Sequence, residues 1–332
     1  MWRNLFRKVL LRAFLILYNY RNYLFSLIDY GVKMCGIVGL FAKQKTIESR
    51  LGTLLGDMLI TMSDRGPDSA GVAIYSEKKS LMIKVTIQSE MSETDFPNLE
   101  TFLKQKKYST PRLIINSSHA VLLLNQKNAP AILADIKVNF PKIRIMSTGT
   151  SIEIYKEVGE PVSVVDRFNI RRMTGSHGIG HTRMATESAV TTLGAHPFST
   201  GNDQCLVHNG SLSNHNSLRR SLVKRGISFE TENDSEVAAS YLTDKMNNGA
   251  NLSEALTSSL NDLDGFYTFV VGTKKGFGVL RDPIACKPAI LAETDTYVAF
   301  GSEYRAFAHL PKIEEAKVWE PEPSTVYFWE HK

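Results

Sequence analysis

The sequence contains few cysteines, and they form no recognisable pairs. Cys35, Cys205 and Cys286 are far apart in the 332 residues and odd in number. They make neither a disulfide framework nor a Cys-x-x-Cys metal motif, so we expect a protein of a reducing compartment, the cytoplasm. The histidines are scattered without metal-ligand spacing, and the chain is expected to hold no metal or cofactor of its own.

An excess of charge is also missing from most of the chain. The net charge is +5, but residues 1–34 contain six basic side chains and one acidic side chain, which accounts for the whole excess. The neutral remainder gives no reason to expect a nucleic-acid partner.

Long hydrophobic runs are absent from residues 1–33, although this segment is rich in leucine and aromatic residues. Its longest uncharged runs, 13–20 and 22–28, are shorter than the roughly 20 apolar residues of a membrane span, so no span is expected. Met34 stands directly before Cys35. We therefore expect residues 1–34 to be an N-terminal extension, translated from an upstream start codon or removed as a propeptide, and absent from the mature protein. An amphipathic helix retained at a membrane surface is the alternative.

Internal repeats and low-complexity segments are absent, and the apolar periodicity predicts elements of ordinary length. Residues 35–42 are typical of a buried strand, and residues 47–62 have apolar positions at helical spacing. Residues 180–186 (GHTRMAT) are expected to form a loop. Further helices and strands are predicted at 214–224, 235–246, 253–260, 266–272, 278–280, 289–292, 297–300 and 325–329. Strands followed by helices and then by strands indicate an antiparallel layered α+β fold.

Residues 78–174 differ from the segments on either side. Strand-like runs are mixed there with a polar helical stretch near 98–106, and no group of reactive side chains is found. We interpret this block as an α+β subdomain inserted into one domain that spans residues 35–332.

The most informative position is Cys35, which follows Met34. Methionine is readily removed before a small residue, so a chain started at Met34 would begin with this cysteine. An N-terminal cysteine combines a thiol nucleophile with an α-amine whose ordinary pKa is about 7.7–8.0 and which can take the proton of the thiol. Taken alone, however, Cys35 is better explained as a small buried side chain on a strand.

Other positions offer groups for binding a polar substrate. Arg183 has a guanidinium that can hold a carboxylate with two hydrogen bonds, and Asn209-Gly210 places a side-chain amide beside a permissive backbone N–H, a pair suited to an oxyanion hole. Asp234 and Arg65 add one charge of each sign. Each position also has a structural explanation. Arg183 is suited to a salt bridge, Asn209-Gly210 to a hairpin turn, and Asp234 to a helix N-cap, and Arg65 is suited to a turn with a solvated charge.

Seven short motifs occur in one order along the chain: CGIVG, RGPDSAG, GHTRMAT, AHPF, VHNG, NDSEVAA and RDPIACKP. This ordered set resembles the class II glutamine amidotransferases, whose domain belongs to the N-terminal-nucleophile hydrolases, over roughly residues 35–77 and 175–310. The resemblance implies a four-layer αββα sandwich of antiparallel sheets, with the 78–174 block as an insertion. GHTRMATESAVTTLGAHPF and the ending VWEPEPSTVY look more narrowly like the separate amidotransferase subunit of glutamate-synthase-like complexes, N-methylglutamate synthase among them.

The resemblance also implies catalytic roles. Cys35 would attack the side-chain amide carbon of L-glutamine, with its own α-amine handling the proton. Asn209 and Gly210 would stabilise the oxyanion of the tetrahedral intermediate, and Arg65 would lie near the nucleophile.

The zwitterionic end of glutamine would be held by residues of opposite charge. The resemblance places Arg183 on the α-carboxylate, with Thr186 beside it, and Asp234 on the α-ammonium. Met184 and Glu187 stand where the sugar-phosphate-making members of the family usually have Trp and His. These two departures concern the coupling of ammonia to an acceptor and not the hydrolysis itself.

The resemblance further implies a partner. Ammonia would pass to a separate glutamate-synthase-like subunit, which would carry any FMN and iron–sulfur cofactors, and the sequence leaves a homo-oligomer open. Two alternative functions stay open. One is a stand-alone hydrolase of γ-glutamyl amides, which would prefer a larger amide to glutamine as its substrate. The other is a non-catalytic glutamine-binding subunit, whose function would be unchanged by loss of the Cys35 thiol.

Overall fold

The computed structural model describes residues 34–76, 82–106, 112–185 and 189–331. The chain divides into two units, Met1–Met34 and Cys35–Lys332, and the fold described below is that of the second unit. Thr186, one of the expected substrate-binding residues, lies outside the described residues.

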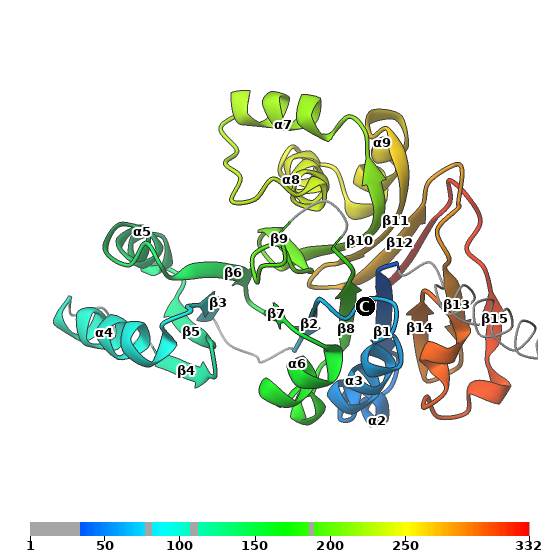
Figure 1. Cartoon of the computed structure of the whole chain (residues 1–332), viewed down its shortest axis with the longest axis horizontal. Helices are drawn as coiled ribbons and strands as arrows, with labels where there is room; N and C mark the ends of the chain where they lie inside the picture. The colour runs from blue at the N-terminus through cyan, green and yellow to red at the C-terminus, as the bar shows by residue number, and fades with distance from the viewer. Residues whose placement is uncertain (1–33, 77–81, 107–111, 186–188, 332) are drawn as a thin grey trace, which may run out of the picture. The chain divides into compact units, whose positions relative to one another are not determined.

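The larger of the two main sheets has seven antiparallel strands in the order β15-β13-β14-β1-β8-β2-β7. The strands are β1 Gly36–Ala42, β2 Ser69–Tyr75, β7 Ile152–Val158, β8 His177–Arg183, β13 Ile290–Glu293, β14 Tyr297–Gly301 and β15 Lys317–Trp319. Strands from the beginning, middle and end of the sequence thus lie side by side, as Figure 1 shows for the blue β1 and the green β8.

The second main sheet has five antiparallel strands in the order β16-β12-β11-β10-β9. They are β9 Phe198–Gly201, β10 Gln204–Leu212, β11 Gly265–Gly272, β12 Gly276–Arg281 and β16 Val326–Glu330. Alternate side chains of the two sheets interdigitate in one buried cluster that includes Ile37, Ile179, Val207 and Val270. The two sheets therefore pack face to face.

Helices cover the outer face of each sheet, because the side chains on those faces are also apolar. The helical segments are α2 Lys45–Glu48, α3 Leu51–Thr61, α6 Pro161–Arg167, η1 Ile170–Arg172, α7 His215–Lys224, α8 Asp234–Asn247, α9 Leu252–Asp262, η2 Tyr304–Phe307 and η3 Ile313–Glu315. A cluster of α3, α6 and the outer face of the larger sheet forms one core, and α8, α9 and the smaller sheet form another. The order of layers is helix, sheet, sheet, helix, which confirms the α+β fold of antiparallel sheets.

A third sheet of four strands stands beside this sandwich in the order β4-β5-β3-β6. It consists of β3 Met82–Gln88, β4 Arg112–Asn116, β5 His119–Asn125 and β6 Arg144–Gly149, and it packs against α4 Ser92–Gln105 and α5 Ala129–Asn139 around its own core. The four-stranded sheet and its two helices span residues 82–149, a shorter stretch of sequence than the expected insertion at 78–174. β7 pairs with β2 along its whole length, and α6 packs on α3, so the chain has returned to the sandwich by residue 152.

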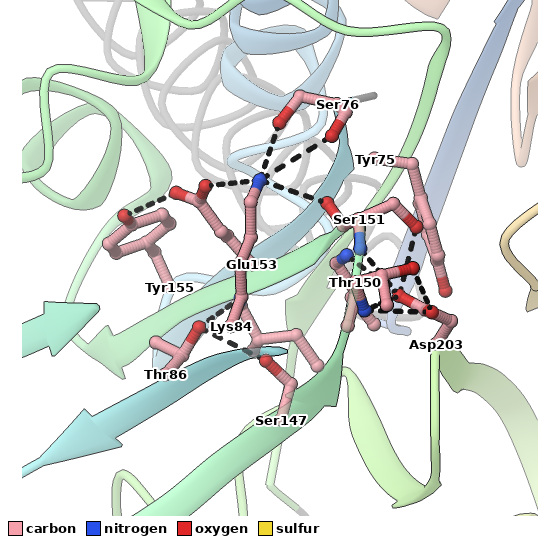
Figure 2. A network of polar contacts seen from close by, with 12 residues as sticks. Tyr75, Ser76, Lys84, Thr86, Ser147, Thr150, Ser151, Glu153, Tyr155 and Asp203 are labelled. Carbon is pink, nitrogen blue, oxygen red and sulfur yellow. Dashed lines mark hydrogen bonds and ion pairs between the residues drawn. The ribbon is translucent and has the colours of Figure 1, made fainter. Parts of the chain in front are cut away.

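Two groups of polar contacts join the four-stranded sheet to the sandwich (Figure 2). In the first, the buried Lys84 on β3 donates through Nζ to Ser76 Oγ at 2.8 Å and forms an ion pair with Glu153 on β7 at 2.9 Å. In the second, the Asp203 carboxylate accepts hydrogen bonds from the backbone N–H groups of 150–152 and from the hydroxyls of Thr150 and Ser151, at 2.8–3.1 Å. The turn between β6 and β7 is thereby fixed to the turn before β10.

Replacement of Asp203 by asparagine is expected to lower the free energy of unfolding by about 3 kcal/mol, because buried donors lose a charged acceptor. Burial raises the pKa of Asp203, but the N–H groups of 150–152 and the Ser151 hydroxyl outweigh it, so the pKa lies below its usual value. The stabilisation is therefore present above the unfolded pKa of about 3.9 and is lost as the pH falls through the folded value.

Urea unfolding of the two proteins at pH 7 and at lower pH measures both effects. The wild type should lose more stability on acidification than Asp203→Asn does. Asp295→Asn, which changes an exposed aspartate, is the matched control and should leave the free energy of unfolding unchanged.

The structure corrects the expected loop at 180–186. Residues 180–183 are the end of β8, which is buried along its whole length and lies between β1 and β2. The glycines explain the misassignment: a Cβ at Gly178 would come within 2.8 Å of Leu55 Cδ2, and one at Gly180 within 3.0 Å of Val38 Cγ2. Glycine lets α3 pack closely on β8 while making the segment look unlike a strand.

Candidate active site

The ends of three paired strands meet at one edge of the larger sheet. β1 begins there with Gly36 opposite Thr182 of β8, and β2 begins with Ser69 opposite Arg183. Cys35 immediately precedes β1. Strand pairing therefore places Cys35 and Arg183 at the same edge, although they are far apart in the sequence.

Cys35 is partly buried at this edge, and its thiol lies 3.8 Å from the backbone oxygen of Met184. Burial raises the pKa of the thiol above its ordinary value, and the contact with Met184 and the charge of Arg183 offset this only in part. The thiol is therefore mostly protonated at neutral pH, and its use as a nucleophile requires a base.

The backbone oxygen of Cys35 accepts two hydrogen bonds. Asn209 Nδ2 donates to it at 3.0 Å from β10, and Arg65 Nε donates to it at 3.1 Å from the segment after α3. The Asn209 bond joins the two sheets. Since the amide nitrogen has two hydrogens, Asn209 keeps a second N–H for another acceptor.

Gly210 follows Asn209 on β10 and pairs with Tyr267. Its φ of 151° falls in a range that favours glycine, and a Cβ would lie 2.0 Å from the backbone oxygen of Phe266. A side chain is thus excluded at this position, and the residue beside Asn209 has to be glycine.

Arg183 ends β8 and is buried, with 5% of its surface exposed. Its NH1 group donates to the backbone oxygen of Ala189 at 3.3 Å, so the guanidinium is directed along the segment that follows β8. Asp68 supports the same segment, because its carboxylate accepts from Ala185 N at 2.8 Å and its own N–H donates to Arg183 O at 3.1 Å.

Asp234 is the first residue of α8, and Asn233 caps the helix through Ser235 N. The Asp234 carboxylate accepts from Leu212 N at 2.9 Å and lies 3.7 Å from His208 Nδ1. Burial raises its pKa, but the His208 ring and the Leu212 N–H outweigh burial and bring the pKa to about 2. Asp234 is therefore ionised at neutral pH and is suited to a cationic group.

His208 links several of these parts. Its ring contacts Asp234 and accepts or donates at Ser235 Oγ at 2.9 Å, while its backbone oxygen accepts from His181 Nε2 at 3.0 Å. Burial lowers the pKa of His181 to about 3, so this ring is neutral. His208, Asp68 and Glu303 could not be identified from the sequence, because their partners are distant along the chain. Glu303, for example, forms its ion pair with Arg65.

Across the described residues, no three His, Cys, Asp or Glu side chains are arranged to hold a metal ion. Within the same part of the chain, no helix is both long enough and apolar enough to cross a membrane.

Comparison with solved structures shows the fold class. The larger part of the chain superposes on glutamine phosphoribosylpyrophosphate amidotransferase from B. subtilis with a TM-score of 0.57 and 19% sequence identity, covering 89% of this chain and 47% of that one. This chain thus spans about half the length of that enzyme. The sandwich of two antiparallel sheets between helices is the fold that the chain shares with that amidotransferase.

Comparison of sequences shows the family. A family model for a glutamine amidotransferase domain matches residues 181–309. The "glutamine amidotransferase-like protein GlxB" of Rhizobium meliloti (strain 1021) is 64% identical over 303 residues, which are 90% of this chain and 99% of that protein. An amidophosphoribosyltransferase of Synechocystis is 31% identical over 158 residues, 45% of this chain and 32% of that protein. The chain belongs to the glutamine amidotransferase family, and it is an enzyme of this kind.

Proposed function

We propose that the chain hydrolyses L-glutamine to L-glutamate and ammonia with the Cys35 thiol as nucleophile. The observation that carries the proposal is that Asn209 donates to the Cys35 backbone oxygen at 3.0 Å, while the pairing of β1 with β8 brings Arg183 to the same end of the sheet as Cys35. The thiol sulfur adds to the amide carbon, and the thiol proton is transferred to the amide nitrogen, so that the C–N bond breaks and ammonia leaves. Water then adds to the thioester carbon, and the C–S bond breaks to give glutamate and the free thiol.

The second N–H of Asn209 and the backbone N–H of Gly210 would stabilise the oxyanion of each tetrahedral intermediate. The α-carboxylate would be bound by Arg183 together with Thr186, and the α-ammonium by Asp234. Fixing both charges at one end orients the amide at the other end against Cys35.

The position of Cys35 directly after Met34 supports a further part of the proposal, that the mature enzyme begins at Cys35. A free α-amine on the same residue would be the base that takes the thiol proton. In this proposal residues 1–34 are an extension that is removed or not translated, and residues 35–332 form one amidotransferase domain with an inserted subdomain.

We further propose that the ammonia passes, in the cytoplasm, to a separate glutamate-synthase-like subunit that carries FMN and iron–sulfur cofactors. The motifs from 180 to 198 and the C-terminal VWEPEPSTVY support this partner. So does the relative from Rhizobium meliloti, whose length is almost wholly aligned with this chain and leaves little room for a further domain in that protein.

The partner is tested by purifying the chain from its own cells under mild conditions. We expect a flavin-containing protein to co-purify, and glutamine hydrolysis by the isolated chain to be slower than in the complex. A chain that purifies alone, and whose rate of glutamine hydrolysis does not change when other subunits are added, contradicts the proposed partner. That result leaves the proposed hydrolysis itself in place.

A further inference from the structure

Glu303 lies on the far side of Arg65 from Cys35. It follows β14, where the neighbouring Ser302 accepts through Oγ from Ile37 N at 2.9 Å and donates through its own N–H to Ile37 O at 2.9 Å. The residue before Glu303 is therefore bonded to Ile37, two residues after Cys35. The Glu303 carboxylate forms an ion pair with Arg65 NH1.

Arg65 is held at two of its nitrogens. It is 8% exposed, Nε donates to the Cys35 backbone oxygen at 3.1 Å, and NH1 contacts Glu303 Oε1, whereas NH2 donates to no described residue. A planar guanidinium held at Nε and NH1 has a defined orientation, because its five N–H groups form a rigid fork. Glu303 thus determines how Arg65 presents Nε to Cys35.

The charge of Glu303 is maintained by two arginines. Its second oxygen accepts from Arg305 Nε at 2.5 Å, and Arg305 in turn makes two hydrogen bonds to Asp64 at 2.7 and 2.8 Å. Partial burial raises the pKa of Glu303, but the hydrogen bonds from Arg65 and Arg305 outweigh it, so the pKa lies below its usual value. Glu303 is ionised throughout the neutral range.

We infer that Glu303 is a positioning residue for glutamine hydrolysis, which acts through Arg65 on the placement of Cys35. The inference rests on the proposed function of Cys35. Without the carboxylate, the buried guanidinium loses its anionic partner and turns toward other acceptors. The Cys35 backbone oxygen then keeps only the hydrogen bond from Asn209, and the thiol is no longer held at a fixed distance from the substrate amide.

The test is Glu303→Gln, which keeps the shape of the side chain and removes its charge. We expect kcat for glutamine to fall about 100-fold, the effect of a small misplacement of reacting groups, with KM nearly unchanged. Active enzyme is counted by titration with an electrophilic glutamine analogue that alkylates the thiol, so that misfolded protein does not enter kcat. Glu303→Asp, which keeps the charge, should recover part of the loss.

Two further variants separate a positioning role from a structural one. Glu315→Gln removes an exposed glutamate, paired with Lys312 at 3.3 Å, and should leave kcat unchanged. In an Arg65→Lys background, Glu303→Gln should lower kcat little further, because both residues act through one contact.

Three results would each overturn the inference. The first is an unchanged kcat in Glu303→Gln, and the second is a fall in kcat that multiplies with that of Arg65→Lys. The third is a smaller fraction of titratable active sites with an unchanged kcat per active site. A wild-type chain that hydrolyses no glutamine, or a Cys35→Ala variant that still does, would instead refute the proposed function, so the two failures are distinguishable.

Discussion

Replacement of Cys35 by alanine is expected to reduce glutamine hydrolysis by about 10⁴-fold or more, because no other described group at the site can form the thioester. Asn209 and Arg183 would remain in place, so the variant should still bind glutamine. Ammonia release measured with a coupled dehydrogenase gives the rate, and isothermal titration gives the affinity.

The control for this substitution is Cys286→Ala, since Cys286 is exposed and makes none of the contacts described for the site. It should retain full activity. The active preparation should also show, by intact mass, a chain that begins at Cys35. A stable and fully active chain that keeps residues before Cys35 would have no free α-amine on the nucleophile, and this mechanism of proton transfer would have to be abandoned.

Replacement of Asn209 by alanine is expected to lower kcat by about 10²–10³-fold, the usual effect of removing one oxyanion donor. The change also removes the hydrogen bond at 3.0 Å to the Cys35 backbone oxygen, which adds to the loss. KM should change little, because Asn209 binds the charge that develops during the reaction and not the charged end of the substrate. Steady-state kinetics separates the two constants.

Asn139→Ala, at the exposed end of α5, is the matched control and should leave both constants unchanged. A loss that appears in KM alone would contradict the role of Asn209 in the oxyanion hole. It would instead place the amide among the groups that bind the ground state.

The elements with clear apolar periodicity could be predicted from the sequence, and β8 could not. The predicted strand at 35–42 and the helices near 214–224, 235–246 and 253–260 lie within a few residues of β1, α7, α8 and α9. β8 has two glycines and several polar residues, and it is buried on both faces as a central strand. Neither alternation nor an apolar run identifies such a strand, because its glycines are determined by the helix that packs on it.

The candidate site shows a similar division. The order of the motifs grouped Cys35, Asn209 and Arg183. The structure places Cys35 and Arg183 at one edge of the larger sheet, with Asn209 of the smaller sheet in contact with Cys35. The supporting residues could not be identified, because Glu303 reaches Arg65 across 238 positions and Asp68 reaches Ala185 across 117. Such pairs leave no pattern in the local sequence. Before the strands are paired, nothing distinguishes Glu303 or Asp68 from other charged residues in turns.

The position of β8 between β1 and β2 has a consequence for heat inactivation. Backbone pairing over 36–41 on one side and 69–75 on the other ties the proposed nucleophile and Arg183 to the interior of the sheet. Interior strands open only at a cost close to that of complete unfolding. Separation of Cys35 from Arg183 therefore requires loss of the sandwich itself, and the enzyme should keep its activity on heating until the whole domain melts.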